Sequence, residues 1–259
     1  MLDIKAIPIL TDNYVWLIAD QANRSAVVVD PGDAAPVAQA LQQQNVSLAG
    51  ILVTHQHWDH VGGIEALVKQ YHCPVFGPNS PSIPSITHPV HEGSEVAIDN
   101  TLRFSVIEIP GHTQEHLGYI LEQPEGTSLF CGDTLFSAGC GRLLGGTATQ
   151  LKSSLDRIKQ LPIRTSIYCT HEYTAANLLF ANTVMPENAA VKAYMAKVKS
   201  HRQNNAPTLP STLETELQIN PFLRCDDDQV KATVEAAFDK QASNEEDVFT
   251  LLRQWKDRF

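Results

Sequence analysis

The sequence has no long apolar run, no closely paired cysteines and no excess of basic residues. None of its hydrophobic stretches approaches the roughly 20 residues that cross a bilayer, and Met1-Leu2-Asp3-Ile4-Lys5 lacks the basic-then-apolar pattern of a signal peptide. The five cysteines form an odd set without a Cys-x-x-Cys pair, which favours reduced thiols. We therefore expect a cytoplasmic protein that does not interact with membranes.

Charge and length narrow the class of protein further. The formal net charge of −10 disfavours a nucleic acid partner, which requires a basic face. Local basic residues can still bind a small anion. With 259 residues, of which 43% are hydrophobic, the chain is long enough for one large core or for a core with a smaller second domain.

Short β-branched segments alternate with amphipathic ones along the first two-thirds of the chain. The expected strands are residues 4–9, 14–19, 25–29, 51–53, 74–76, 102–109, 117–121, 128–131 and 165–169, and the expected helices are 34–44, 61–71 and 147–160. Residues 78–91 are rich in Pro and Ser and predict an irregular loop. This alternation, with hairpins mixed in, favours a layered α/β sandwich.

The strand pattern stops after about residue 174. Apolar residues then recur at spacings of three and four, which predicts helices at 174–184, 187–204, 227–239 and 245–255. We therefore divide the chain into a catalytic domain at 1–173 and a helical domain at 174–259.

The most informative stretch, residues 54–60, reads Thr-His-x-His-x-Asp-His. In an extended backbone that leaves a strand, residues two apart project to one side, so we expect His55, His57 and Asp59 to point together. His60 then requires a bend, which Gly62-Gly63 would permit. A polar loop with chance histidines is the alternative interpretation. Three imidazoles and a carboxylate make a poor core, however, and suit a divalent metal.

Three later strands each end on a single His or Asp. These residues are His112, Asp133 and His171, and sites of open α/β sheets gather at such strand ends. Together with the first motif they give the candidate ligands His55, His57, Asp59, His60, His112, Asp133 and His171. This set has more members than the roughly three or four protein ligands that one zinc ion binds. It suits two metals if one carboxylate is shared, and Asp133 is the natural bridge.

These motifs resemble the metallo-β-lactamase fold family and, within it, glyoxalase II, the hydroxyacylglutathione hydrolase family, over essentially the whole chain. The matching segments are Thr-His-x-His-x-Asp-His at 54–60, Pro-Gly-His-Thr at 110–113, Cys-Gly-Asp-Thr-Leu-Phe at 131–136, Gly-Cys-Gly-Arg at 139–142, His-Glu-Tyr-Thr at 171–174 and the ending at 253–259. The first motif specifies only the superfamily, and the later ones narrow it. The resemblance implies an αββα sandwich followed by a C-terminal α-helical domain.

The resemblance also implies how the ligands are shared between two metal ions. His55, His57 and His112 would hold the first ion, Asp59, His60 and His171 the second, and Asp133 would bridge them. Zinc is our first expectation, with iron or manganese as alternatives, because His and Asp accept all three. Asp59 could also orient or deprotonate the attacking water.

The activity that the resemblance implies is hydrolysis of S-(2-hydroxyacyl)glutathione thioesters, the second step of methylglyoxal detoxification. The main substrate would be S-D-lactoylglutathione, cleaved to glutathione and D-lactate by a hydroxide that bridges the metals. We expect a monomer whose partner is this small molecule.

Four residues would contact glutathione by the same resemblance: Arg142, Tyr173, Arg253 and Lys256. A solvated helix face is the alternative for Arg253 and Lys256, which are three residues apart. Packing at a domain junction is the alternative for Tyr173. Leu144 stands where the family commonly has an aromatic residue, so a hydroxyl contact is lost there.

Several alternatives remain open at this point. Asp30 is either a turn former or a partner of a ligand, and Trp58 either packs in the core or shields the metals. His116 is expected to support a ligand through a hydrogen bond, and His88 and His91 to lie on the surface.

Four other functions are also considered for this chain. A mono-iron glutathione persulfide dioxygenase would lack the second metal set and much of the helical tail. A flavo-diiron oxidoreductase would have Glu in place of His57. An RNA-processing nuclease is disfavoured by charge, and a non-catalytic metal-binding module would lack a ligand.

Overall fold

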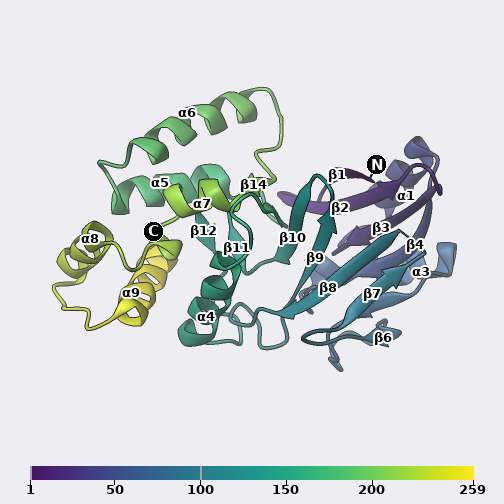
Figure 1. The fold of residues 1–259 in the computed structure, drawn as a ribbon, viewed down its shortest axis with the longest axis horizontal. Helices are drawn as coiled ribbons and strands as arrows, with labels where there is room; N and C mark the ends of the chain where they lie inside the picture. Colours follow the sequence, from purple (N-terminus) through teal and green to yellow (C-terminus); the bar gives the residue numbers. More distant parts are fainter. Residues whose placement is uncertain (1, 100) are drawn as a thin grey trace. The chain divides into compact units, whose positions relative to one another are not determined.

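The computed structural model describes residues 2–99 and 101–259, which form two compact units. Unit 1 contains the chain up to Glu108 and then Glu115–Gly132, whereas unit 2 contains Ile109–Gln114 and Asp133–Phe259 (Figure 1). Unit 2 therefore includes residues from both sides of position 173, so the predicted boundary between residues 173 and 174 stays a prediction. Within the described ranges, no helix has the length and apolar character needed to cross a membrane.

The first sheet of unit 1 has the strand order β1-β2-β3-β4-β5-β6. Its strands are Leu2–Ile9, Asn13–Asp20, Ser25–Val29, Ser47–Leu52, Val75–Gly77 and His88–Pro89. The pairs β1–β2 and β2–β3 are antiparallel, and the strands from β3 to β6 run parallel. Parallel strands end at the same edge of a sheet, so the residues after β3 and β4 are brought together there.

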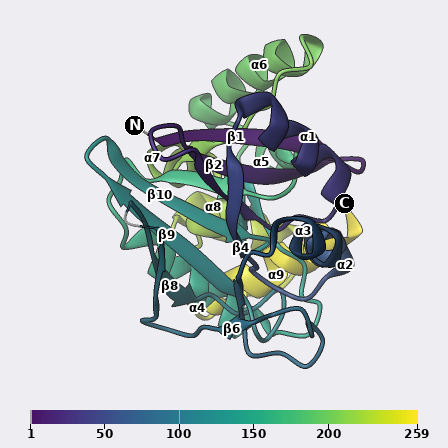
Figure 2. The ribbon, with the colours of Figure 1, turned by 90° about the vertical axis from the view of Figure 1, so that its right-hand side faces the viewer.

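Two helices cover one face of this sheet. They are α1, Ala34–Gln44, and α3, Ile64–Tyr71, which pack against β1 and β4 (Figure 2). Their buried residues Val37, Leu41, Ile64 and Leu67 join the strand residues in one hydrophobic core. The Asp33 side chain begins α1 by accepting a hydrogen bond from the Ala35 amide.

The second sheet of unit 1 is an antiparallel meander of β7, Glu95–Ile98, β8, Leu102–Glu108, β9, Leu117–Gln123, and β10, Gly126–Gly132. The two sheets face each other, because the buried Tyr119 of β9 donates its hydroxyl to the Val53 carbonyl at 2.7 Å. Unit 1 is therefore a sandwich of two sheets with helices on the outside of the first, as the alternating sequence pattern predicts.

Unit 2 is mostly helical. Its elements are β11 (Leu135–Phe136), β12 (Gly139–Cys140), α4 (Ala148–Lys159), β13 (Ser166–Cys169), α5 (Thr174–Val184), α6 (Ala189–Gln203), β14 (Ser211–Thr212), α7 (Leu213–Ile219), a 3-10 turn at Pro221–Leu223, α8 (Asp228–Phe238) and α9 (Glu245–Arg258). Phe180, Phe222 and Phe249 form its aromatic core, with ring centroids 5.7–6.0 Å apart. The predicted helices after residue 174 are confirmed.

The sequence interpretation missed the shortest elements. It predicted one helix at 61–71, but the chain forms the four-residue helix α2, Trp58–Val61, and then α3. It also omitted β6, β7, β11, β12, β14 and α7, and β6 lies within residues 78–91, for which it predicted an irregular loop. Segments this short contain too few residues for a repeat of two or 3.6 to become visible.

Candidate metal centre

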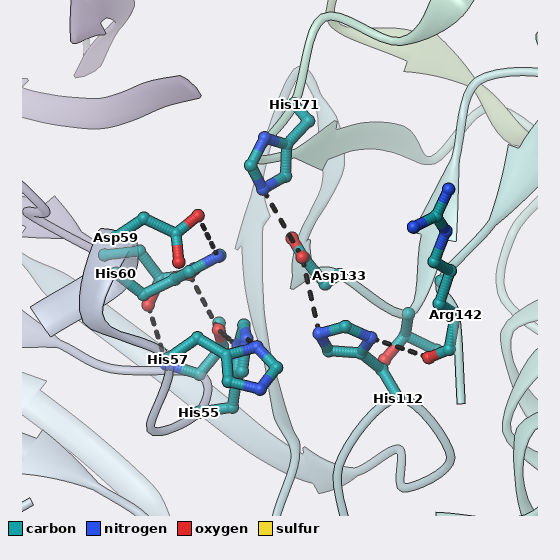
Figure 3. Close-up of polar contacts among 12 residues, drawn as sticks. His55, His57, Asp59, His60, His112, Asp133, Arg142 and His171 are labelled. Atoms are coloured by element: carbon teal, nitrogen blue, oxygen red, sulfur yellow. Dashed lines mark hydrogen bonds and ion pairs between the residues drawn. The ribbon is translucent and has the colours of Figure 1, made fainter. Parts of the chain in front are cut away.

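Two ring nitrogens face each other just beyond the end of β4. The His55 Nε2 atom lies 3.0 Å from the His57 Nδ1 atom (Figure 3). The Thr54 hydroxyl donates to Asp30 Oδ2 at 2.7 Å, so its oxygen accepts the Nδ1 proton of His55 at 3.0 Å. We assign the proton of His55 to Nδ1 on this network, which leaves Nε2 to bind a cation.

Asp30 holds a second histidine in the same way. Its buried carboxylate accepts from the Thr54 amide at 2.8 Å and contacts His60 Nδ1 at 2.9 Å. His60 Nε2 is then directed toward the Asp59 carboxylate, 3.6 Å away. Asp30 also turns the backbone, with φ +53° and with its carbonyl accepting from the Gly32 amide at 2.9 Å. Both interpretations of Asp30 are therefore correct, since it forms a turn and also orients ligand candidates.

The geometry predicted for the first motif is partly wrong. Asp59 does not alternate with His55 and His57 along an extended backbone, because α2 begins at Trp58 and turns Asp59 toward its neighbour His60. Trp58 is 70% exposed, so it is not a core residue.

Gly62 and Gly63 serve close packing rather than a special bend. Their φ angles of −60° and −88° are open to any residue. A Cβ atom would, however, lie 2.7 Å from the Gly32 carbonyl oxygen and 2.6 Å from that of Pro31, respectively. These glycines let the turn after β3 approach α2 closely.

Asn13 is a site residue that the sequence interpretation missed. Its side-chain amide is buried and donates to Asp59 Oδ2 at 2.9 Å. Asn13 is the first residue of β2 and the last of the Thr11-Asp12-Asn13 segment, whose composition indicates only a turn. Only the fold shows that this turn reaches a carboxylate 46 positions away.

In unit 2, the Asp133 carboxylate lies between two histidines. Its Oδ2 atom is 3.5 Å from His112 Nε2 and 3.4 Å from His171 Nε2 (Figure 3). His112 Nδ1 donates to the Arg142 carbonyl at 2.7 Å, so the Nε2 atom of His112 is the one available for a metal. The three residues are buried, with exposures of 4–6%.

The chemistry of these donor groups fits divalent metal. In each unit, histidine ring nitrogens lie 3.0–3.6 Å from a nitrogen of another imidazole or from a carboxylate oxygen. His and Asp atoms collected in this way, and largely buried, match the ligand preferences of zinc, iron and manganese.

Three cations of unit 2 lie close enough to influence one another. They are Arg142, Arg253 and Lys256, and the pKa of Lys256 is lowered by burial and by the charges of Arg253 and Arg142. The side chain of Arg253 is buried, at 4% exposure, so the alternative of a solvated helix face does not apply to it. Its Nη1 atom donates to the Cys140 carbonyl at 2.8 Å, and Nη2 pairs with Asp257 at 3.0 Å.

Aromatic rings stack on the ligand candidates. The Tyr173 ring lies parallel to that of His171, with centroids 4.7 Å apart, and the Tyr173 side chain is 37% exposed. His116 is buried and stacks on His55 at 4.7 Å. Leu144 is 54% exposed, and His88 and His91 are exposed as predicted.

All five cysteines are free thiols, as the sequence predicted, and all five are buried. Cys140 lies in the Gly-Cys-Gly-Arg segment, and burial raises its pKa to about 11. A thiol with such a pKa is protonated at neutral pH, so Cys140 acts as a packing residue and not as a nucleophile.

Comparisons with known proteins agree with this architecture. The metallo-beta-lactamase superfamily model matches residues 10–171, and the model of the hydroxyacylglutathione hydrolase C-terminus matches residues 172–259. A hydroxyacylglutathione hydrolase from Aliivibrio fischeri is 47% identical over 100% of both chains. The resemblance deduced from the motifs is therefore confirmed.

Solved structures share the fold. ETHE1 from Myxococcus xanthus is similar with a TM-score of 0.67 and 24% identity, covering 98% of this chain and 91% of that one. TTHA1623 in a di-iron-bound form gives a TM-score of 0.61 and 25% identity, covering 85% and 100%. The chain matches the superfamily, its full-length relatives are named as hydrolases, and its His and Asp side chains form groups that could hold a metal. It is therefore a hydrolase that binds divalent metal. It belongs to the metallo-beta-lactamase superfamily and, within it, to the hydroxyacylglutathione hydrolase family.

Proposed function

We propose that this chain hydrolyses S-(2-hydroxyacyl)glutathione, chiefly S-D-lactoylglutathione, to glutathione and D-lactate. Membership in the family supports the substrate class, because the full-length relatives are named for it. The observation that carries the chemistry is the Asp133 carboxylate between His112 and His171, since a carboxylate shared by two histidine groups suits a pair of metal ions.

We propose that two ions bind, each through three residues of its own. His55, His57 and His112 would hold one, Asp59, His60 and His171 the other, and Asp133 would bridge them. Zinc is the first choice of metal, with iron or manganese as alternatives. The di-iron form of TTHA1623 supports a count of two.

The bound ions would supply a hydroxide at neutral pH and would polarise the thioester carbonyl. The chain's own part is to fix the donors. Asn13 holds the carboxylate of Asp59, which could also orient or deprotonate the water. The departing thiolate needs no dedicated acid, because a thiol has a pKa of only about 8.5.

The cationic residues Arg142, Arg253 and Lys256 would attract the carboxylates of glutathione. Arg142 is exposed and Lys256 is half-buried, so both can reach a ligand, whereas Arg253 would act mainly through its charge. The exposed Tyr173 would offer its hydroxyl to the glutathione backbone. Leu144 offers no hydroxyl, and we expect glutathione affinity to reflect this loss.

We also propose a monomer in a reducing, cytoplasmic environment. The five buried free thiols support that compartment, since disulfides are rare there.

The test follows cleavage of S-D-lactoylglutathione by absorbance, before and after exhaustive chelation. We expect activity to vanish with the metal and to return when zinc, iron or manganese is added. Asp133→Asn should abolish activity, whereas Asp156→Asn, on the surface of α4, should not. Undiminished turnover by the metal-free protein would reject the proposal. Oxygen uptake with glutathione persulfide would favour the dioxygenase instead.

A further inference from the structure

The hairpin of β11 and β12 connects two residues of the proposed site. It begins two residues after Asp133 and ends two residues before Arg142. Any shift of this hairpin would therefore displace the proposed bridging ligand or the proposed substrate contact. Buried side chains hold its backbone in place, and three of them, Asn177, Glu216 and Asn220, have no part in the proposed reaction.

Asn220, at the end of α7, links both strands of the hairpin. Its side-chain amide donates to the Phe136 carbonyl at 3.1 Å and to the Gly139 carbonyl at 2.9 Å. The side-chain oxygen of Asn220, Oδ1, accepts from the Phe222 amide at 3.1 Å. The side chain is completely buried, so it cannot contact a ligand in solution.

Glu216, one turn earlier on α7, holds the tip of the hairpin. Its carboxylate accepts from the Ala138 amide at 2.8 Å and from Asn220 at 3.2 Å. Ala138 has φ +56°, a conformation that is unfavourable for a residue with a Cβ atom and needs such support. Glu216 is fully buried, and burial raises its pKa.

Two further helices complete the support. Asn177 of α5 donates to the Ser137 carbonyl at 3.1 Å, and Arg253 of α9 donates to the Cys140 and Gly141 carbonyls at 2.8 and 3.3 Å. The backbone carbonyls held by side chains are thus those of Phe136, Ser137, Gly139, Cys140 and Gly141. So many buried side-chain bonds to one short hairpin fix its position tightly.

The supported hairpin touches the proposed site at both ends. The Phe136 ring lies 5.8 Å from His171 and 5.2 Å from Tyr173, centroid to centroid. Beyond β12, the Arg142 carbonyl accepts the proton of His112 Nδ1. The position of the hairpin therefore sets the positions of Tyr173 and Arg142 together.

We infer that Glu216 and Asn220 are positioning residues, which act through the β11–β12 hairpin to aim Arg142 and Tyr173 at the glutathione part of the substrate. This inference rests on the proposed function. A purely structural role would instead change only the stability of unit 2.

The test compares Asn220→Ala and Glu216→Gln with matched controls. Asn204→Ala removes another Asn that supports a helix end, by donating to the Ser200 carbonyl of α6 at 2.9 Å. Glu235→Gln alters another carboxylate that accepts a backbone amide, that of Ala242. For each variant with equal metal content, we measure the Kd for glutathione by calorimetry, KM and kcat for the thioester, and the unfolding temperature.

We expect Asn220→Ala to raise both the Kd for glutathione and KM about tenfold, with a smaller change in kcat, because a charged contact is misdirected. Glu216→Gln retains one acceptor and should have a smaller effect in the same direction. It also provides a readout if Asn220→Ala does not fold. The two controls should lower the unfolding temperature and leave the Kd unchanged.

The outcomes separate the two claims. If the wild-type chain cleaves the thioester while both hairpin variants keep the wild-type Kd and KM, the inference is overturned and the proposed function stands. If the wild-type chain neither cleaves the thioester nor binds glutathione, both fall.

Discussion

At the scale of single residues, the supporting hydrogen bonds decide which atom of each histidine is offered to a metal. Asp30 shows this directly, because one carboxylate fixes His60 and, through the Thr54 hydroxyl, also His55. Asp30 is not itself a proposed metal ligand, yet it orients the rings of two proposed ligands, His55 and His60.

Asp30→Asn should therefore weaken metal binding. The amide group replaces one accepting oxygen by a donor, so either the Thr54 amide loses its acceptor, or the Thr54 hydroxyl and His60 Nδ1 lose theirs together. We expect metal affinity to fall by about tenfold or more and the free energy of unfolding to fall by roughly 1–3 kcal/mol. Metal affinity is measured by competition with a chelator. Asp33→Asn, at the start of α1, is the control, because Asn begins a helix as well as Asp does. An unchanged affinity in Asp30→Asn would contradict this account.

Lys256→Met tests the cationic cluster. A lysine whose pKa is lower in the folded than in the unfolded state costs stability at every pH below its folded pKa, and the cost disappears as pH rises past 10.5. At pH 7 the variant should therefore be as stable as the wild type or more stable, and this difference should shrink at high pH. Its Kd for glutathione should nevertheless rise about tenfold. Denaturant unfolding and calorimetry measure the two effects.

The matching control is Lys199→Met on the exposed surface of α6, which should change neither quantity. In the wild type, glutathione affinity should fall as pH rises toward the lowered pKa of Lys256. Stability lost on Lys256→Met without any change in the Kd for glutathione would mean that the lysine serves packing alone.

The residues that the sequence could name differ in kind from those it could not. His55, His112 and Asp133 follow strand ends and belong to recognisable motifs, so their proximity to similar groups was predictable. Asn13, Glu216 and Asn220 lie in ordinary turn or helix sequence, and their roles depend on contacts between positions 46 or more residues apart. A pattern read along the chain contains no information on such distances.

At the scale of elements, the turn after β3 packs closely against helix α2. A Cβ atom on Gly32 would lie 1.9 Å from the Asp59 carbonyl oxygen. The long elements were predictable from their periodicity, whereas α2 was not, because its four residues include two proposed ligands and an exposed Trp58 in place of an apolar repeat. Because the residues of this motif are of the types that bind metal, they do not show the apolar repeat of a helix.

Gly32→Ala should displace α2. The new methyl group meets backbone atoms that cannot rotate away, so we expect a loss of roughly 1–3 kcal/mol in the free energy of unfolding and weaker metal binding through Asp59 and His60. Gly93→Ala is the contrasting control. Gly93 has φ +76°, but a Cβ atom there would meet no other atom within 4 Å, so backbone strain should lower stability without changing metal affinity. Equal metal affinities in the two variants would argue against the coupling between this turn and α2.

At the scale of the whole molecule, the boundary between the two family models does not coincide with the boundary between the two compact units. The family models meet between residues 171 and 172, close to the predicted domain boundary. Unit 2 nevertheless joins residues 133–171 to the C-terminal helices, through the packing of α4 on α9 and the ion pair of Lys152 with Glu245 at 2.9 Å. Sequence periodicity identifies helices, but it does not show which earlier segment they pack on.

A fragment that ends at residue 173 should therefore fold incompletely. It lacks Asn177, Asn220 and Arg253, which hold the β11–β12 hairpin, and it exposes the buried face of α4 at Leu151 and Leu155. We expect amide protons in residues 133–171 to exchange rapidly in this fragment, while those in the first sheet of unit 1 remain protected. Hydrogen exchange followed by mass spectrometry measures both regions in one sample. Adding the fragment 174–259 in trans is the control, and it should restore protection in 133–171. Full protection of residues 133–171 in the isolated fragment would show that the motif boundary, and not the compact unit, is the folding boundary.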